Sequence, residues 1–254
     1  MSLNIKEENG FKYIEEGEGD VLLLLHGLFG ALSNWEDVTN NFKSQYKVVI
    51  PLLPIYELPL LTTGVTSLAK FLYKFVKFKK LKNITLLGNS LGGHVGLIFT
   101  ISHPEYVKAL VLTGSSGLYE NSFGGTFPRR ESYDFIKEKV ALTFYDPNFA
   151  TKELVDEVFE TVNDRGRVIR ILAMAKSAIR HNMSKDLHKI TIPVCLIWGM
   201  NDTVTPPDVA REFHNILPNS ELNWIDKCGH APMMEQPEEF NACLKKFLER
   251  VLLK

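Results

Sequence analysis

A serine, an aspartate and a histidine that follow predicted strands could together carry nucleophilic catalysis: Ser90, Asp202 and His230, in that order along the chain. A serine hydroxyl is a weak nucleophile until a base in contact with it takes its proton. A histidine of near-neutral pKa can take that proton and later return it to a leaving group. A buried carboxylate fixes the tautomer of the imidazole and favours its protonated form. These residue types therefore supply a nucleophile, a base and an orienting acid.

The sequence around Ser90 predicts how its hydroxyl is presented. Residues 84–87 are an apolar run that suits a buried strand, residues 88–92 are Gly-Asn-Ser-Leu-Gly, and the segment from His94 onward predicts a helix. This is G-x-S-x-G in a strand–turn–helix context, a nucleophile elbow. Such a turn strains the serine backbone, needs small flanking residues, and directs the Leu91 N–H toward the group that the serine would attack. A glycine-rich turn with an exposed serine is the alternative interpretation.

A second turn of small residues follows the predicted buried strand at residues 21–25. Residues 26–30 are His-Gly-Leu-Phe-Gly. A turn at the C-terminal end of a strand exposes backbone N–H groups to the crevice where open α/β sheets bind ligands. We therefore expect the N–H of Leu28, or that of Phe29, to stabilise an oxyanion together with that of Leu91. An ordinary strand-to-helix turn is the alternative, and for His26 we expect a structural role in hydrogen-bonding the loop.

Other reactive residues are weaker candidates. Asp208 and Asp226 compete with Asp202 for the carboxylate position. Asp208 is predicted inside a helix, however, and Asp226 is too close in sequence to His230. Cys228 could be a reactive thiol, although the sequence shows no setting that would lower its pKa.

The order of the predicted elements indicates an α/β fold with a mostly parallel, doubly wound sheet. Strand patterns at residues 11–14 and 21–25 flank a short glycine turn, and we expect them to pair antiparallel at an N-terminal sheet edge. Strands and helices then alternate, which is typical of parallel sheets. Further strands are expected at residues 47–50, 84–87, 107–113, 194–198 and 221–225.

Residues 118–187 break this alternation, because they predict helices without strands and are rich in aromatic residues. We expect them to form a helical cap over the crevice, inserted into an α/β core made of residues 1–117 and 188–254. The cap helices are expected at residues 132–144, 151–162 and 165–179. Arg129 and Arg130 could bind an anionic group of a substrate, but paired surface arginines are usually solvated.

The amino-acid composition is typical of a globular α/β domain and argues against a nucleic-acid-binding protein. The chain has 254 residues, of which 45% are hydrophobic, and a formal net charge of −1. This suits a large α/β domain, and a nucleic-acid partner is not expected without a basic face. The three cysteines lack metal-ligand spacing, so we expect no metal, no cofactor and reduced thiols in a cytoplasmic protein. We expect no secretory signal, because residues 1–8 contain no apolar run, and no membrane span, because no apolar run approaches the required length.

Four motifs together resemble signatures of the α/β-hydrolase superfamily. They are residues 26–30 (His-Gly-Leu-Phe-Gly), 88–93 (Gly-Asn-Ser-Leu-Gly-Gly), 198–202 (Trp-Gly-Met-Asn-Asp) and 228–232 (Cys-Gly-His-Ala-Pro). The resemblance covers residues 11–252 and is strongest to capped carboxylesterases and to meta-cleavage-product hydrolases, which cut carbon–carbon bonds. It implies a catalytic triad of Ser90, Asp202 and His230, in the chain order of that family. It also gives the oxyanion role to the N–H groups of Leu28 and Leu91.

One stretch departs from the family pattern. After the strand at residues 47–50 the family usually has an Asp-x-x-Gly-x-Gly loop, whereas residues 51–59 are Pro-Leu-Leu-Pro-Ile-Tyr-Glu-Leu-Pro. The crevice wall beside this loop is therefore expected to differ from that of relatives. The serine at position 90 argues against haloalkane dehalogenases and epoxide hydrolases, which have aspartate there.

These observations predict a serine hydrolase, monomeric or homodimeric, that cleaves a small carboxylic ester with an apolar acyl or alcohol part. Two alternatives remain open. The Gly-Asn-Ser sequence of the turn motivates a carbon–carbon bond hydrolase of the meta-cleavage type. The alternative from another class is a non-catalytic ligand-binding protein on an inherited hydrolase fold.

Overall fold

Parallel strands carry the candidate residues to one edge of a sheet. The computed structural model describes residues 4–29, 35–121 and 129–252, and within them eight strands form one sheet. In spatial order these are β1 (Lys6–Glu8), β2 (Phe11–Glu16), β4 (Tyr46–Pro51), β3 (Asp20–Leu25), β5 (Ile84–Asn89), β6 (Val107–Thr113), β7 (Val194–Gly199) and β8 (Ser220–Ile225). From β4 to β8 neighbouring strands are parallel, whereas β1 and β2 are antiparallel. The predicted mostly parallel sheet with an antiparallel N-terminal edge is confirmed.

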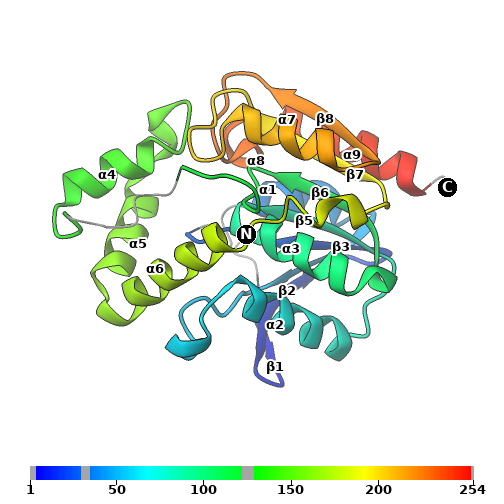
Figure 1. Cartoon of the computed structure of the whole chain (residues 1–254), viewed down its shortest axis with the longest axis horizontal. Coiled ribbons are helices and arrows are strands. Elements are labelled where there is room, and N and C mark those ends of the chain that lie inside the picture. The colour runs from blue at the N-terminus through cyan, green and yellow to red at the C-terminus, as the bar shows by residue number, and fades with distance from the viewer. Residues whose placement is uncertain (1–3, 30–34, 122–128, 253–254) are drawn as a thin grey trace.

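Helices cover both faces of this sheet (Figure 1). One face packs against α1 (Glu36–Phe42), α8 (Pro232–Glu235) and α9 (Pro237–Leu252), and the other against α2 (Val65–Phe78), α3 (Leu91–Ser102) and α7 (Pro207–Ile216). The all-apolar strand β3 serves both cores, because successive strand side chains point to opposite faces. Leu22 and Leu24 contact the first group of helices, and Leu23 and Leu25 contact the second.

The predicted antiparallel pairing of β2 with β3 is wrong. Strand β4 lies between them, antiparallel to β2 and parallel to β3. The glycine segment that joins β2 to β3 is therefore no hairpin turn but crosses the start of β4. A Cβ atom on Gly17 would lie 2.1 Å from the carbonyl oxygen of Lys43, so only glycine fits this crossing. The short strand β1, which is polar and lacks alternation, was not predicted.

Three helices form a group of their own: α4 (Tyr133–Ala141), α5 (Lys152–Asn163) and α6 (Arg165–Arg180). Each begins after a residue whose side-chain oxygen accepts a hydrogen bond from the first helical turn, namely Ser132, Thr151 and Asp164. Their apolar faces build a separate small core. In Figure 1 they lie together on the left, beside the sheet and its helices.

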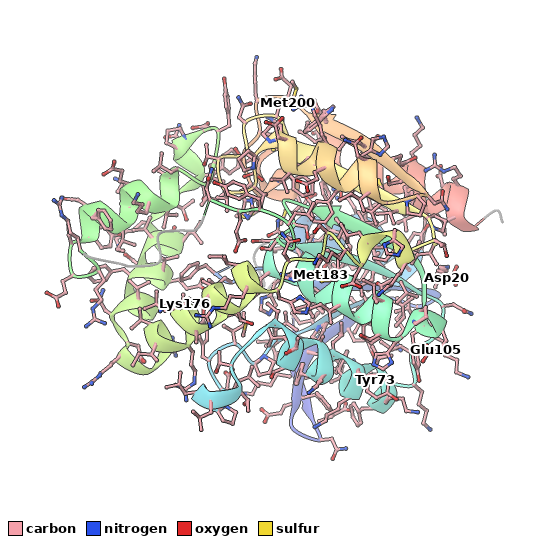
Figure 2. All side chains as sticks on the ribbon, in the orientation of Figure 1. Asp20, Tyr73, Glu105, Lys176, Met183 and Met200 are labelled. Carbon is pink, nitrogen blue, oxygen red and sulfur yellow. The ribbon has the colours of Figure 1, made fainter. Side chains whose placement is uncertain are left out.

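The chain leaves the sheet for these helices and returns to it at adjacent points. The N–H of Met183 donates a hydrogen bond of 2.7 Å to the carbonyl oxygen of Gly117. Figure 2 shows Lys176 on α6 and Met183 after this helix, where the chain reaches α3. The limits 118 and 187 for a cap domain remain a prediction, but the exit and the return lie side by side.

The remaining helical segments are short 3-10 turns at Leu60–Thr62, Pro104–Tyr106, Pro147–Phe149 and Leu187–Lys189. In the described ranges, no helix is both long enough and apolar enough to cross a bilayer.

Two glycine variants test the crossing over β4. Gly10 and Gly17 both have positive φ, but a Cβ on Gly10 meets nothing within 4 Å, whereas one on Gly17 meets the backbone before β4. We expect Gly10→Ala to lower the free energy of unfolding by about 1–2 kcal/mol, the cost of a left-handed backbone for an L-residue. Gly17→Ala should cost at least about twice as much, because a backbone segment must also move. Urea denaturation measures both, and equal losses would contradict the crossing.

Candidate active site

The predicted strand–turn–helix around Ser90 is present. Ser90 follows β5, immediately precedes α3 and has φ 53° and ψ −120°, a strained conformation for a residue with a Cβ. A Cβ on Gly88 would lie 2.6 Å from the backbone of Gly93, and one on Gly92 would lie 2.2 Å from the carbonyl oxygen of Leu25. The flanking glycines therefore leave the room that the sharp turn needs.

Asp202 and His230 meet although 28 residues separate them. The Oδ2 atom of Asp202, in the loop after β7, lies 2.9 Å from Nδ1 of His230, in the loop after β8. The Asp202 side chain is fully buried, and its Oδ1 atom accepts hydrogen bonds from the N–H groups of Val204 and Thr205. The carboxylate is thus held in place and in turn positions the imidazole.

The surroundings of His230 act on its pKa in opposite directions. Burial lowers the pKa, but the charge and hydrogen bond of Asp202, together with the charges of Glu120 and Glu235, raise it by more. The net pKa is above the usual value for histidine, so the pocket favours the imidazolium. This is the protonation state that a general base reaches after it takes a proton.

Ser90 and His230 line the same cavity, which has a volume of about 160 Å³. The described residues show no hydrogen bond between these two side chains; such contacts are often long before a substrate binds. Leu28, Phe29 and Leu91, the residues expected to supply oxyanion donors, line the same cavity as Ser90, and their role stays a prediction.

The far wall of the cavity is apolar. It is built from α4, α5 and α6, through Val140, Leu154, Val158, Ile171, Leu172, Met174, Ala175 and Ala178. Phe144, which follows α4, is one of the predicted cap aromatics that reaches the cavity. Polar lining includes Ser116, Glu120, Asn121 and Thr143. The site therefore combines reactive groups at one end with an apolar compartment at the other.

His26 has the structural role predicted for it. Its Nε2 accepts a hydrogen bond of 2.9 Å from the N–H of Leu53, and its Nδ1 lies 2.9 Å from the carbonyl oxygen of Gly27. Burial lowers the pKa of His26, which favours the neutral ring that these bonds require. His26 thus ties the turn of residues 26–30 to the unusual loop of residues 51–59.

The competing candidates lie elsewhere. Asp208 is in α7, as predicted, and pairs with Arg211 on the surface, whereas Asp226 is exposed. Cys228 is buried, and burial raises the pKa of its thiol, which opposes a reactive thiolate.

Neither Arg129 nor Arg130 lines the cavity described here. The aromatic residues Phe123 and Phe127 of the predicted cap lie outside the described residues.

Sequence analysis missed three residues that support the site. The hydroxyl of Thr205 donates a hydrogen bond of 2.8 Å to Oδ2 of Asp202. Glu235 accepts hydrogen bonds from the N–H groups of Gly229 and Tyr145, and so ties the His230 loop to the end of α4. Glu120 lines the cavity. A threonine three residues after the candidate acid was the one local signal available, whereas the other two contacts depend on tertiary structure.

We expect Thr205 to affect turnover by holding the carboxylate of Asp202 in place. Thr205→Val keeps the shape of the side chain but removes a hydrogen bond to a buried carboxylate, a loss worth about 1.5–3 kcal/mol. We expect hydrolytic turnover to fall by about tenfold or more, whereas Thr205→Ser should retain most of it. The measurement is kcat on a chromogenic ester, with circular dichroism as the check on folding. Equal turnover by the valine and serine variants would show that the hydroxyl does not hold Asp202.

Comparison with known proteins identifies the family of the chain. The family model described as alpha/beta hydrolase fold matches residues 20–163 and 171–237. The chain is similar to a 2-hydroxy-6-oxononadienedioate/2-hydroxy-6-oxononatrienedioate hydrolase from Pseudomonas sp, with 27% identity over 270 residues that cover 96% of this chain and 94% of the relative.

Two solved structures show the same architecture. MGS-MChE2, an alpha/beta hydrolase enzyme from the metagenome of sediments from the lagoon of Mar Chica, Morocco, is 48% identical with a TM-score of 0.81, and the match covers 97% of this chain and 98% of that one. A meta-cleavage product hydrolase from Pseudomonas fluorescens IP01 is 19% identical with a TM-score of 0.83, covering 95% of both chains. The chain therefore belongs to the α/β hydrolase family and is a hydrolase.

Proposed function

We propose that the protein is a serine hydrolase of small carboxylic esters. The Oγ atom of Ser90 forms a bond to the acyl carbon while its proton passes to Nε2 of His230. His230 returns that proton to the departing alcohol oxygen as the carbon–oxygen bond breaks. A water molecule, deprotonated by the same imidazole, then releases the acid and restores Ser90.

The observation that carries this proposal is the convergence of three distant residues on one cavity. His230 bonds the buried Asp202 at 2.9 Å, and the strained Ser90 lines the cavity with His230. In this proposal the N–H groups of Leu91 and Leu28 stabilise the oxyanion, with Phe29 as the alternative to Leu28. Each such donor contributes about 10²–10³ in turnover.

Residues 118–187 act in this proposal as the cap that forms the apolar compartment. An engineered cavity of roughly 150 Å³ holds a benzene molecule, and the cavity here has a volume of about 160 Å³. A substrate with an apolar part of about that size therefore suits the wall formed by α4, α5 and α6. The protein should act on it as a monomer or homodimer.

Carbon–carbon bond hydrolysis is the second candidate function, and the named activity of the Pseudomonas relative favours it. One observation opposes it, and another makes the sequence of the turn neutral between the two reactions. The substrate named for that relative is a dicarboxylate, whereas the described residues that line the cavity include Glu120 and no Lys or Arg. The amide of Asn89 donates hydrogen bonds to the carbonyl oxygens of Thr113 and His230, so this residue of the turn has a structural role that fits either reaction.

A fluorophosphonate probe tests the proposed nucleophile. The wild-type protein should be labelled at Ser90, as mapped by tandem mass spectrometry, and Ser90→Ala should abolish the labelling. Ser115→Ala is the matched control, since Ser115 is buried nearby but does not line the cavity, and its labelling should persist. Labelling that survives Ser90→Ala would remove the proposal.

The same preparation distinguishes the candidate functions. Short p-nitrophenyl esters should be hydrolysed, and a dienoic ring-fission product should not. Turnover of the dienoic acid alone would favour the carbon–carbon reaction, and ligand binding without turnover of any ester would favour a non-catalytic protein.

The pKa of His230 tests the link to Asp202. In the wild type, burial lowers the pKa of His230 and the carboxylate of Asp202 raises it. Asp202→Asn removes the negative charge, so the effect of burial should prevail and the pKa of His230 should fall. His230 in the variant should therefore stay neutral to a lower pH than in the wild type, while turnover falls by about 10⁴-fold. NMR titration of the imidazole measures the pKa without needing activity. Asp208→Asn, which removes an exposed carboxylate, is the control, and an unchanged His230 pKa in Asp202→Asn would contradict the link.

A further inference from the structure

Glu120 places a carboxylate in the wall of the apolar cavity. Its side chain is partly buried and lines the cavity together with Ser90 and His230. Its Oε2 atom accepts a hydrogen bond of 2.6 Å from the hydroxyl of Ser116, whose own N–H donates to the carbonyl oxygen of Ser90. Glu120 is thus fixed to the same turn that carries the nucleophile. The proposed steps of ester hydrolysis give this carboxylate no contact with the substrate.

Among the described residues, the carboxylate of Glu120 faces no Lys or Arg, and its nearest positive charge is that of protonated His230. In the described part of the chain, no Lys or Arg forms an ion pair with it and none lines the cavity. The sequences of residues 30–34 and 122–128 contain no Lys or Arg either. Burial raises the pKa of Glu120 by more than the Ser116 hydrogen bond and the charge of His230 lower it. Because His230 is the general base in this proposal and is neutral when the reaction starts, a cationic group of a ligand is the further positive charge that could pair with Glu120.

Because Glu120 lies close to His230, we can infer whether Glu120 would contact the acyl part or the alcohol part of an ester. The two side chains line one cavity, and the charge of each acts on the pKa of the other. During ester cleavage the departing oxygen must approach the imidazole to receive its proton. The alcohol half therefore lies on the side of His230 and Glu120, and the acyl half can occupy the apolar compartment of α4, α5 and α6.

We propose that Glu120 is a specificity-determining residue that selects esters whose alcohol part carries a protonated amine. This inference rests on the proposed ester hydrolysis and adds the substrate class. The ammonium N–H would donate to the Glu120 carboxylate, while the Ser116 hydroxyl keeps the carboxylate oriented. A dicarboxylate would instead meet an uncompensated like charge.

Two isosteric esters test the proposal. 2-(Dimethylamino)ethyl butanoate, which is protonated at neutral pH, and 3-methylbutyl butanoate differ in one position, N–H⁺ against C–H. We expect kcat/KM of the wild-type enzyme, corrected for spontaneous hydrolysis, to be at least about tenfold higher for the amino ester. Glu120→Gln keeps the shape and removes the charge, so the ratio of the two kcat/KM values should fall by about tenfold, to the ratio set by the intrinsic reactivity of the two esters. Glu120→Gln also changes the pKa of His230, but this change affects the hydrolysis of both esters equally and therefore cancels in the ratio.

Asp226→Asn is the control for a general loss of negative charge, because Asp226 is exposed in the same loop as His230. It should leave the ratio within about twofold of the wild-type value, since exposed charges interact weakly. A wild-type ratio near one overturns the proposal even if Glu120→Gln fails to fold, and leaves ester hydrolysis intact. A ratio that survives Glu120→Gln also overturns it. If neither ester is hydrolysed and fluorophosphonate does not label Ser90, ester hydrolysis itself fails and this inference fails with it.

Discussion

The buried carboxylate of Asp202 is the charge on which the arrangement of this edge of the sheet depends. A charge out of contact with water must be satisfied by donors, and the loops after β7 and β8 supply them. Two backbone N–H groups and the hydroxyl of Thr205 come from its own loop, and His230 comes from the next. The Thr205 segment is fixed in turn, since the indole of Trp198 donates to its carbonyl oxygen. The imidazole is oriented because the acid beneath it is fully hydrogen-bonded.

The parts of the fold that follow local rules could be predicted from the sequence. The turn at Ser90 needs glycines within two residues of it, and the buried strands need continuous apolar runs, so both leave clear local patterns. The strand Val107–Thr113 was predicted with its observed limits. Chain order was enough to nominate Ser90, Asp202 and His230, because loops after parallel strands meet at one edge.

What the sequence could not predict depends on which segments become neighbours. The partner of a strand is not encoded in its own alternation, so β2 and β3 were paired by proximity along the chain although β4 separates them. The contacts of Glu235 with Tyr145 and of Glu120 with Ser116 likewise exist only once the loops are packed. The family resemblance indicated the chemistry, but the carboxylate of Glu120 in the cavity, on which the proposed substrate choice depends, had to come from the structure.

The loop that carries His230 is bonded to the chain after α4 but not to α5 or α6 among the described residues. The N–H of His230 donates to the carbonyl oxygen of Thr143, and the neighbouring residues Tyr145 and Gly229 share the carboxylate of Glu235. The segment after α4 therefore supports the loop of His230, whereas α5 and α6 line the cavity but form no such bond to this loop among the described residues. Substitutions that change the substrate range should consequently accumulate on α5 and α6. The length and backbone course of the chain after α4 should stay constant.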